Sequence, residues 1–244
     1  MTNRYRIAGR TVGITSLYEE VHRLCAAYRT EDANAVLSVI ITREDIEYER
    51  ARSAQEDEAA GRPVRQFSDG YLETLAVYRS IAEEMPTYDT LLFHCSCVAV
   101  DGVGYCFAAV SGTGKSTHAR LWRELLGDRA VMINDDKPLI RVTDEGATIY
   151  GTPWDGKHRL STNTAVPLKA ICLLERAGEN RIRPITAGEG YPMLLQQVYR
   201  PKSGAAMSRT LLLFDRLLSS VSLWRLGCNM DIEAARVAYE AMKG

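Results

Sequence analysis

The stretch that decides the fold is Ala109-Val-Ser-Gly-Thr-Gly-Lys-Ser116, which lies between an apolar run at 105–110 and a helical pattern at 117–126. It matches the phosphate-binding loop pattern G-x-x-x-x-G-K-[ST], except that Ala109 replaces the first glycine. Strand, glycine-rich loop and helix, in this order, form the context that the motif requires. The sequence therefore predicts a loop that binds the phosphates of a nucleoside triphosphate.

Each residue type in this loop has a physical role. Gly112 and Gly114 can adopt positive φ, which turns successive backbone N–H groups toward an anion. Lys115 is placed to reach the β- and γ-phosphates, and the Ser116 hydroxyl is a ligand for magnesium. The following helix directs the positive end of its dipole at the same anion. The predicted nucleotide-binding residues are Ser111, Gly112, Thr113, Gly114, Lys115, Ser116 and Thr117.

Two adjacent carboxylates follow the next apolar run. The segment Val131-Met-Ile-Asn-Asp-Asp136 reads as a buried strand that ends in Asp135 and Asp136. Phosphoryl transfer needs one acid to hold magnesium and one group to orient or deprotonate the attacking hydroxyl. We predict that the pair divides these roles, with Ser116 and Asp135 as metal ligands. The alternative is an Asx turn ahead of Pro138, and the residues alone leave open which aspartate is the base.

Weaker candidates for a phosphate or substrate clamp lie on both sides of the acidic pair. The polar loop over 151–159 contains Lys157 and Arg159, which can neutralise charge that develops on a transferred phosphoryl group. A basic surface loop is the alternative. His118 lies three residues after Lys115 on one helix face, so it can border the nucleotide, and an exposed helical histidine is the equal alternative.

Composition and charge bound the function classes. The chain has 244 residues, a formal net charge of −1 and an apolar fraction of 46%, which is ample for a hydrophobic core. The balanced charge gives no electrostatic argument for nucleic acid or an anionic membrane. No window reaches the roughly 18 continuous apolar residues that a membrane span needs. Because Met1–Arg10 precedes no apolar h-region, we expect a cytoplasmic protein without a signal peptide.

The six cysteines lie mostly within apolar runs, where a thiol packs as a small hydrophobe. Cys95 and Cys97 are two residues apart and share one face of a strand. With His94 beside them a metal site is the minor alternative, since no second Cys/His cluster supplies the remaining ligands.

The remaining patterns predict a mixed α/β fold. Strand-like runs over 91–100 and 105–110 are joined by Asp101-Gly102, a hairpin signal that leads directly into the glycine-rich loop. The charged segment over 43–65 reads as mobile and solvated, or as a charged helix followed by a loop. We assign 1–88 to an N-terminal region of uncertain role and 89–244 to the nucleotide-binding domain. Other predicted strands lie at 5–14 (a hairpin), 35–42, 130–133, 138–142, 147–150, 168–175 and 221–226, and helices at 16–29, 71–85, 191–199, 208–218 and 231–242.

Three of these elements together resemble the HPr kinase/phosphorylase family and the superfamily that it shares with phosphoenolpyruvate carboxykinase. They are Phe93-His94 ahead of the strand and hairpin, the loop Ser111-Gly-Thr-Gly-Lys-Ser116, and the aspartate pair one helix later. The resemblance covers roughly 90–140 and implies a mixed sheet whose hairpins lead into a P-loop and helix. It also implies that His94 lies near the transferred phosphate. The sequence departs from the family at Cys95, where a glycine is usual, and at Thr117, where an acid is usual.

The sequence and this resemblance predict an ATP- and Mg²⁺-dependent kinase that phosphorylates a hydroxyl of a peptide, protein or small molecule. Its predicted catalytic residues are Asp135, Asp136, His94 and Lys115. Two alternatives stay open: a nucleotide-binding adaptor or ATPase module that serves a biosynthetic partner, and a carboxykinase-like metabolic enzyme. No nucleic acid or membrane partner is expected, and the family analogy suggests a homo-oligomer.

Overall fold

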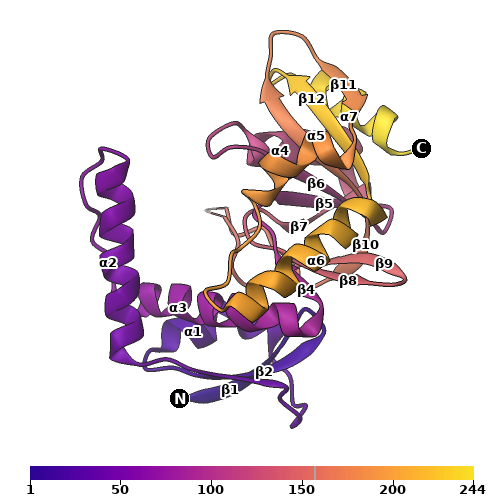
Figure 1. Ribbon diagram of the computed structural model, residues 1–244. Helices are drawn as coiled ribbons and strands as arrows, with labels where there is room; N and C mark the ends of the chain where they lie inside the picture. The colour runs from indigo at the N-terminus through magenta and orange to yellow at the C-terminus, as the bar shows by residue number, and fades with distance from the viewer. Residues whose placement is uncertain (157) are drawn as a thin grey trace. The chain divides into compact units, whose positions relative to one another are not determined.

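Two groups of strands stand out in the computed structural model, one in Met1–Glu84 and one in Met85–Gly244, and the chain divides into these two units (Figure 1). The structure describes residues 1–156 and 158–244. Lys157, a clamp candidate from the sequence, therefore lies outside the described residues. The expected boundary at residue 88 falls at the end of a short 3-10 helix that belongs to the second unit.

The first unit is a three-stranded sheet with helices. Its elements are β1 (Thr2–Ile7), β2 (Arg10–Thr15), α1 (Glu19–Leu24), η1 (Ala26–Tyr28), β3 (Leu37–Ile40), α2 (Arg43–Ala59) and α3 (Asp69–Glu84). β1 and β2 form the predicted hairpin, whose turn residues Ala8 and Gly9 have φ values of 47° and 68°. β3 adds parallel to β2. Buried Glu73 of α3 accepts hydrogen bonds from the backbone N–H groups of Leu17 and Tyr18, which ties α3 to the start of α1.

The charged segment over 43–65 forms a helix followed by a loop, the second of the two interpretations that the sequence allows. Thr42 and Asp45 start α2 with a capping box, in which each side chain binds the other residue's backbone N–H. Beyond the helix, Arg65 donates to the fully buried carboxylate of Asp57 from both its guanidinium and its backbone N–H. This ion pair fixes the loop against the end of the helix.

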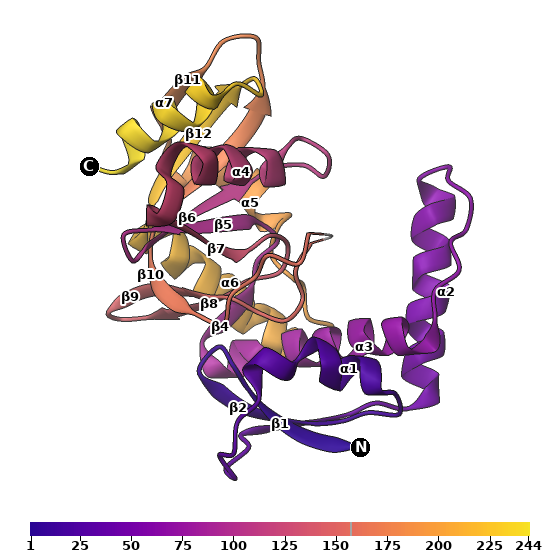
Figure 2. The same cartoon turned by 180° about the vertical axis from the view of Figure 1, so that it is seen from behind.

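In the second unit, nine strands of the described chain form one mixed sheet (Figure 2). The strand order is β4-β8-β9-β10-β6-β5-β7, and β12 pairs with β10 and with β11. Its elements are η2 (Met85–Tyr88), β4 (Thr90–Leu92), β5 (Ser96–Val100), β6 (Val103–Ala108), α4 (Lys115–Leu126), η3 (Gly127–Arg129), β7 (Ala130–Asn134), β8 (Leu139–Thr143), β9 (Gly146–Tyr150), β10 (Ala165–Arg176), β11 (Arg181–Pro184), α5 (Ala187–Leu195), α6 (Gly204–Ser220), β12 (Ser222–Cys228) and α7 (Ile232–Met242).

Helices cover both faces of this sheet because its strands are apolar on both sides. One apolar cluster joins α4 and α7 to the sheet, and buried Trp122 is its largest side chain. A second cluster joins α5 and α6 to the other face through residues such as Leu194 and Phe214. None of the helices within 1–156 and 158–244 is both long and apolar enough to cross a membrane.

The direction of the strands places several strand ends at one edge of the sheet. β10 runs parallel to β6 and to β12, while β5 runs antiparallel to both β6 and β7. β6, β7, β10 and β12 therefore share one direction. Their carboxyl ends and the amino end of β5 lie at the same edge, which is where α/β proteins commonly place their ligands.

The structure corrects the predicted strands in three places. The run over 91–100 splits into β4 and β5, because Phe93 bridges to Val198 and the backbone N–H of His94 donates to Gln197 instead of continuing a ladder. The strand predicted at 168–175 begins earlier, at Ala165, and β11 was absent from the sequence prediction. β11 is a short strand of mostly exposed residues, so no apolar alternation marks it.

Candidate functional site

The glycine-rich loop joins the carboxyl end of β6 to the amino end of α4. Gly112 and Gly114 have φ values of 80° and 123°, a conformation that side chains rarely adopt, which explains glycine at both positions. The Thr113 N–H donates to the Val110 carbonyl at 3.2 Å and closes a turn. Gly114 is the N-cap of α4, and no side chain caps this end. The first N–H groups of α4 therefore lack intrahelical partners and can bind an anion.

Lys115, the first residue of α4, folds back against the loop. Its side chain is buried, and its Nζ donates to the Ala109 carbonyl at 3.2 Å. Burial lowers the pKa of Lys115 below its usual range, and the negative charges of Asp136 and Asp135 partly oppose this shift. The ammonium group is thus held against the backbone at the start of the glycine-rich loop. Ser116 is exposed in the same helical turn, and Thr117 is half-buried beside it.

Asp135 is the inner member of the acidic pair. Its side chain is buried, and its Oδ1 accepts a hydrogen bond of 2.6 Å from the Oγ of Ser96 at the start of β5. A Cβ at Gly156 would lie 3.2 Å from Asp135 Oδ2, so the loop after β9 packs closely over this carboxylate. The sequence did not single out Ser96 or Gly156. Ser96 breaks an otherwise apolar run, and that is the one signal that could have revealed it.

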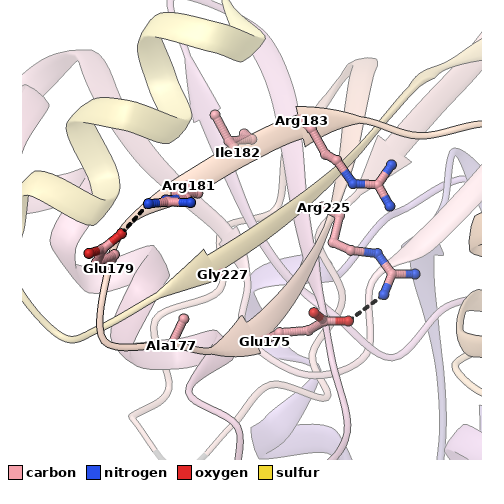
Figure 3. Close-up of a pocket in the computed structure, with 8 residues that line it drawn as sticks. All are labelled: Glu175, Ala177, Glu179, Arg181, Ile182, Arg183, Arg225 and Gly227. Atoms are coloured by element: carbon pink, nitrogen blue, oxygen red, sulfur yellow. Dashed lines mark hydrogen bonds and ion pairs between the residues drawn. The ribbon is translucent and has the colours of Figure 1, made fainter.

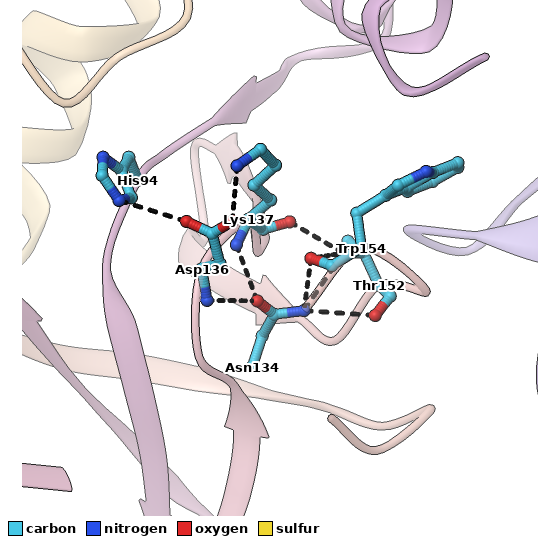
Figure 4. A network of polar contacts seen from close by, with 6 residues as sticks. All are labelled: His94, Asn134, Asp136, Lys137, Thr152 and Trp154. Carbon is cyan, nitrogen blue, oxygen red and sulfur yellow. Dashed lines mark hydrogen bonds and ion pairs between the residues drawn. The ribbon is translucent and has the colours of Figure 1, made fainter. Parts of the chain in front are cut away.

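Asp136 is the outer member, and two cationic or polar side chains hold it (Figure 4). His94 Nε2 lies 3.1 Å from Oδ1, and Lys137 Nζ lies 2.5 Å from Oδ2. Burial raises the pKa of Asp136, but the hydrogen bond from His94 and the charge and hydrogen bond of Lys137 outweigh it and bring the pKa to about 2. The carboxylate is therefore ionised at neutral pH. His94 and Asp136, both named from the sequence, are thus in direct contact.

A fully buried asparagine fixes the turn that carries both aspartates. The Oδ1 of Asn134 accepts from the backbone N–H groups of Asp136 at 2.8 Å and Lys137 at 2.7 Å. Its Nδ2 donates to the carbonyl and hydroxyl of Thr152 at 3.1 Å each, and to the Trp154 carbonyl at 3.4 Å (Figure 4). One amide thus joins the end of β7 to the loop after β9. The Asx turn, the alternative interpretation of this segment, coexists with the half-buried carboxylate of Asp136.

Arg176 enters the site from the neighbouring strand. It is the last residue of β10, and its Nη2 donates to the Gly112 carbonyl at 2.5 Å. The parallel pairing of Leu173 with Ala108 places the end of β10 beside the glycine-rich loop. The strand predicted from the sequence ends at Glu175, so the arginine that follows it was not among the predicted site residues.

The weaker candidates lie in different places. His118 is buried and accepts a hydrogen bond of 3.0 Å from Trp122 Nε1, and its ring packs edge-on against Phe107. Burial lowers the pKa of His118 to about 4, so the ring is neutral and belongs to the core rather than to an exposed helix face. Arg159 is exposed, with a φ of 48° and its backbone N–H bound to the Gly156 carbonyl.

The cysteines near the site lie just before β5, on β5 and on β6, on the sheet face that packs against α5 and α6. Cys95, Cys97 and Cys106 are fully buried in the cluster that packs against α5 and α6. Burial raises the pKa of the Cys95 and Cys106 thiols. His94 is directed to Asp136 instead of to these thiols. In the part of the chain that the structure describes, no group of three or more His, Cys, Asp or Glu side chains is arranged to hold a metal ion by itself.

Comparison with known proteins gives a family and a distant structural match. The family model described as "SynChlorMet cassette protein ScmC" matches residues 68–209, which is more than half of the chain and includes the glycine-rich loop, the aspartate pair and Arg176. Among solved structures, the chain is similar to the Hpr(Ser) kinase/phosphatase from Coxiella burnetii, with 9% identity and a TM-score of 0.34 over 63% of this chain and 99% of that one. The curated proteins contain no match to this sequence.

Proposed function

The chain belongs to the ScmC family of SynChlorMet cassette proteins, and from this premise we propose that it is an ATP-dependent kinase that phosphorylates a hydroxyl group. The observation that carries the proposal is the arrangement at one sheet edge. There the glycine-rich loop follows the carboxyl end of β6, the aspartate pair follows the carboxyl end of β7, and Lys115 is buried beside the loop. A phosphate cradle next to two carboxylates is the set of groups that phosphoryl transfer uses.

In this proposal the loop amides, the amino end of α4 and Lys115 bind the β- and γ-phosphates. Arg176 supports the loop from β10 through its hydrogen bond to the Gly112 carbonyl. Because that bond fixes the orientation of one peptide group, its role is to hold the cradle in the phosphate-binding conformation. Burial lowers the pKa of Lys115, and a bound polyanion would raise it again, because a neighbouring negative charge favours the ammonium form.

The residues present fit a magnesium–nucleotide complex. In such sites magnesium takes one or two carboxylates, and substrate phosphates and water supply its other ligands. Asp135 and the exposed Ser116 hydroxyl are the groups that would hold the ion. When bound, magnesium neutralises charge on the β- and γ-phosphates. Ser96 binds Asp135 Oδ1, which leaves Oδ2 as the oxygen that faces Gly156.

The outer carboxylate and the histidine divide the work of proton transfer. A carboxylate with a pKa of about 2 is a weak proton acceptor at neutral pH. We therefore propose that Asp136 orients the His94 ring. Its carboxylate accepts a hydrogen bond from Nε2, which leaves the other ring nitrogen, Nδ1, free of its proton and able to take one from the substrate. The acceptor hydroxyl loses its proton to Nδ1, its oxygen bonds to the γ-phosphorus, and the bond from that phosphorus to the bridging oxygen of ADP breaks.

The first test is a calorimetric titration of MgATP into the wild-type protein and the Lys115→Ala variant. Loss of one charge-assisted contact to phosphate is expected to weaken binding by about a hundredfold. Lys243→Ala, which removes an exposed lysine paired with Glu240, is the matched control and should bind like the wild type. Absence of MgATP binding to the wild-type protein would overturn the proposal.

Assays of phosphate release and of phosphoryl transfer on the same samples then separate the kinase from its rival. The cassette description leads us to propose that the acceptor is a peptide or small molecule handled by the other cassette proteins. Label from the γ-phosphate should appear on a hydroxyl of such an acceptor. Tight MgATP binding with neither release nor transfer would instead identify a nucleotide-binding adaptor that serves a biosynthetic partner.

A further inference from the structure

A charged hollow lies beyond β10, near the sheet edge where β10 and β12 end. It has a volume of about 590 Å³, and its lining includes Arg181, Arg183, Arg225, Glu175 and Gly227 (Figure 3). These residues come from the ends of β10 and β12 and from the edge strand β11. None of them belongs to the phosphate cradle or to the aspartate pair.

Two of the arginines face each other directly across a pair of strands. β11 and β12 pair antiparallel, and Arg183 is opposite Arg225 in the register. Figure 3 shows both side chains extending to the same side of this strand pair. Like charges at directly opposed positions destabilise a sheet. An arrangement that costs stability without a ligand is explained when an anion lies between the two guanidinium groups.

The carboxylates around the hollow leave most of these arginine donors unused. Arg225 gives Nη1 to Glu175, and Arg183 gives Nη1 to Glu189 at 2.9 Å and to the Pro184 carbonyl at 3.3 Å. A guanidinium group has five N–H donors in a planar fork, which matches the two oxygens of a carboxylate or phosphate. Arg225 Nε is shielded from solvent and has no hydrogen-bond partner among the described residues. Both ion pairs are partly exposed and hence weak, so a ligand can displace or share them.

A glycine forms the floor between the charged residues. Gly227 pairs with Arg181 on one side and with Glu175 on the other. A Cβ at this position would lie 3.2 Å from the Cβ of Ala177, so a larger residue would begin to fill the hollow. Arg225 and Gly227 lie on the same face of β12 as Leu223, which packs toward α5 and α6. Arg176 lies on the same face of β10 as Leu174, which packs on the α4 side. The hollow thus opens on the opposite sheet face from the glycine-rich loop.

We propose that this hollow is an oxyanion-binding site in which Arg183 and Arg225 hold a phosphate or carboxylate group of a small molecule. The inference does not rest on the proposed kinase activity, because the residues, the sheet face and the donors differ from those of the nucleotide site.

The test is calorimetric titration of pyrophosphate, and separately of succinate, into the full-length Lys115→Ala variant, whose phosphate loop is disabled. Pyrophosphate represents a phosphate ligand and succinate a carboxylate ligand. Adding Arg183→Gln or Arg225→Gln should weaken binding of the preferred anion by about ten- to hundredfold, since each change removes charge-assisted bonds. Arg236→Gln, which removes an exposed α7 arginine paired with Glu233, should leave the affinity unchanged.

Arg183→Lys provides a second variant that keeps the charge and loses the planar fork, and it should bind the anion more weakly than Arg183 but more tightly than glutamine. Far-UV circular dichroism confirms that each variant is folded. Binding of pyrophosphate alone or of succinate alone supports the proposal and names the source of the oxyanion. No binding of either anion at millimolar concentration, or equal binding by the Arg183→Gln and Arg225→Gln variants, would overturn it.

Discussion

The imidazole of His94 and the carboxylate of Asp136 form the contact on which the proposed proton transfer depends. We predict that His94→Gln lowers kcat for phosphoryl transfer by about 10² to 10⁴, the usual contribution of a general base. The KM for ATP should change little, because His94 contacts Asp136 and not the glycine-rich loop. His22→Gln, in the first unit, is the control. A parallel loss of ATP affinity in the His94 variant would contradict the assigned role.

Buried His118 predicts a pH dependence of stability. Its pKa falls from 6.5 to about 4 in the folded protein, so the unfolded chain binds more protons between these values. The free energy of unfolding should therefore decrease as the pH falls from about 6.5 to about 4, by up to about 3 kcal/mol. His118→Gln should flatten this slope in urea unfolding followed by tryptophan fluorescence. Trp122→Phe removes the hydrogen bond but keeps the imidazole, and its slope should persist.

The amide of Asn134 was not among the residues chosen from the sequence, although it precedes both aspartates. We predict that Asn134→Ala costs about 2 kcal/mol or more in unfolding free energy, since it leaves several buried backbone groups without partners. Phosphoryl transfer should fall further than MgATP affinity, because the loop itself is untouched. Asn180→Ala, which removes a single bond to the Asn229 N–H, is the control and should be nearly neutral.

At the scale of elements, a substitution at Gly114 can test whether the backbone conformation of the strand–loop–helix unit matters for MgATP binding. A Cβ at Gly114 would meet no atom within 4 Å, but its φ of 123° strains any side chain. We predict that Gly114→Ala weakens MgATP binding by roughly tenfold or more, because about 1–3 kcal/mol of backbone strain opposes the bound conformation. Gly178→Ala also enters open space, at a position without positive φ, and should have no effect. Equal affinities for both variants would contradict this.

The elements that the sequence predicted best are those with strong local signals. The predicted hairpin at Asp101-Gly102 is the turn between β5 and β6. The glycine-rich loop then joins β6 to α4, the predicted helix. The continuous strand predicted over 91–100 was wrong at Phe93-His94, and β11 was missed, both for a tertiary reason. Phe93 leaves the run because it pairs with Val198, a partner more than a hundred residues away that no local pattern shows. β11 exists because β12 offers it a free edge.

At the scale of the whole molecule, the sheet edge shows why the site was only partly predictable. Motifs identified Lys115, Asp135 and Asp136 because each follows a recognisable strand. Ser96 and Arg176 act at the same edge only because β5 runs against β6 and β10 runs with it. Strand order and direction follow from long-range packing, so local patterns could mark Ser96 only as a polar residue in an apolar run and could not place either residue at the site.

The division of the chain leads to a prediction about the second unit. The nine strands and the two apolar clusters that its described residues form lie entirely within Met85–Gly244. We therefore expect a protein of residues 85–244 to fold alone and to bind MgATP within a few-fold of the full-length affinity, as measured by calorimetry. The same fragment carrying Lys115→Ala is the control for specific binding. A fragment that is unfolded, or folded but unable to bind, would contradict the prediction.

The buried cysteines can report when each unit of the protein unfolds locally. Cys25 is enclosed in the first unit, Cys95, Cys97, Cys106 and Cys172 are enclosed in the second, and Cys228 is half-buried. Burial also raises the pKa of Cys25, so an enclosed thiol resists alkylation until the structure around it parts. Alkylation followed by mass spectrometry would then give a separate opening rate for each unit in the wild-type chain. The half-buried Cys228 should be alkylated fastest. A nucleotide bound at the glycine-rich loop would slow alkylation of the buried cysteines in the second unit and leave the alkylation rate of Cys25 unchanged.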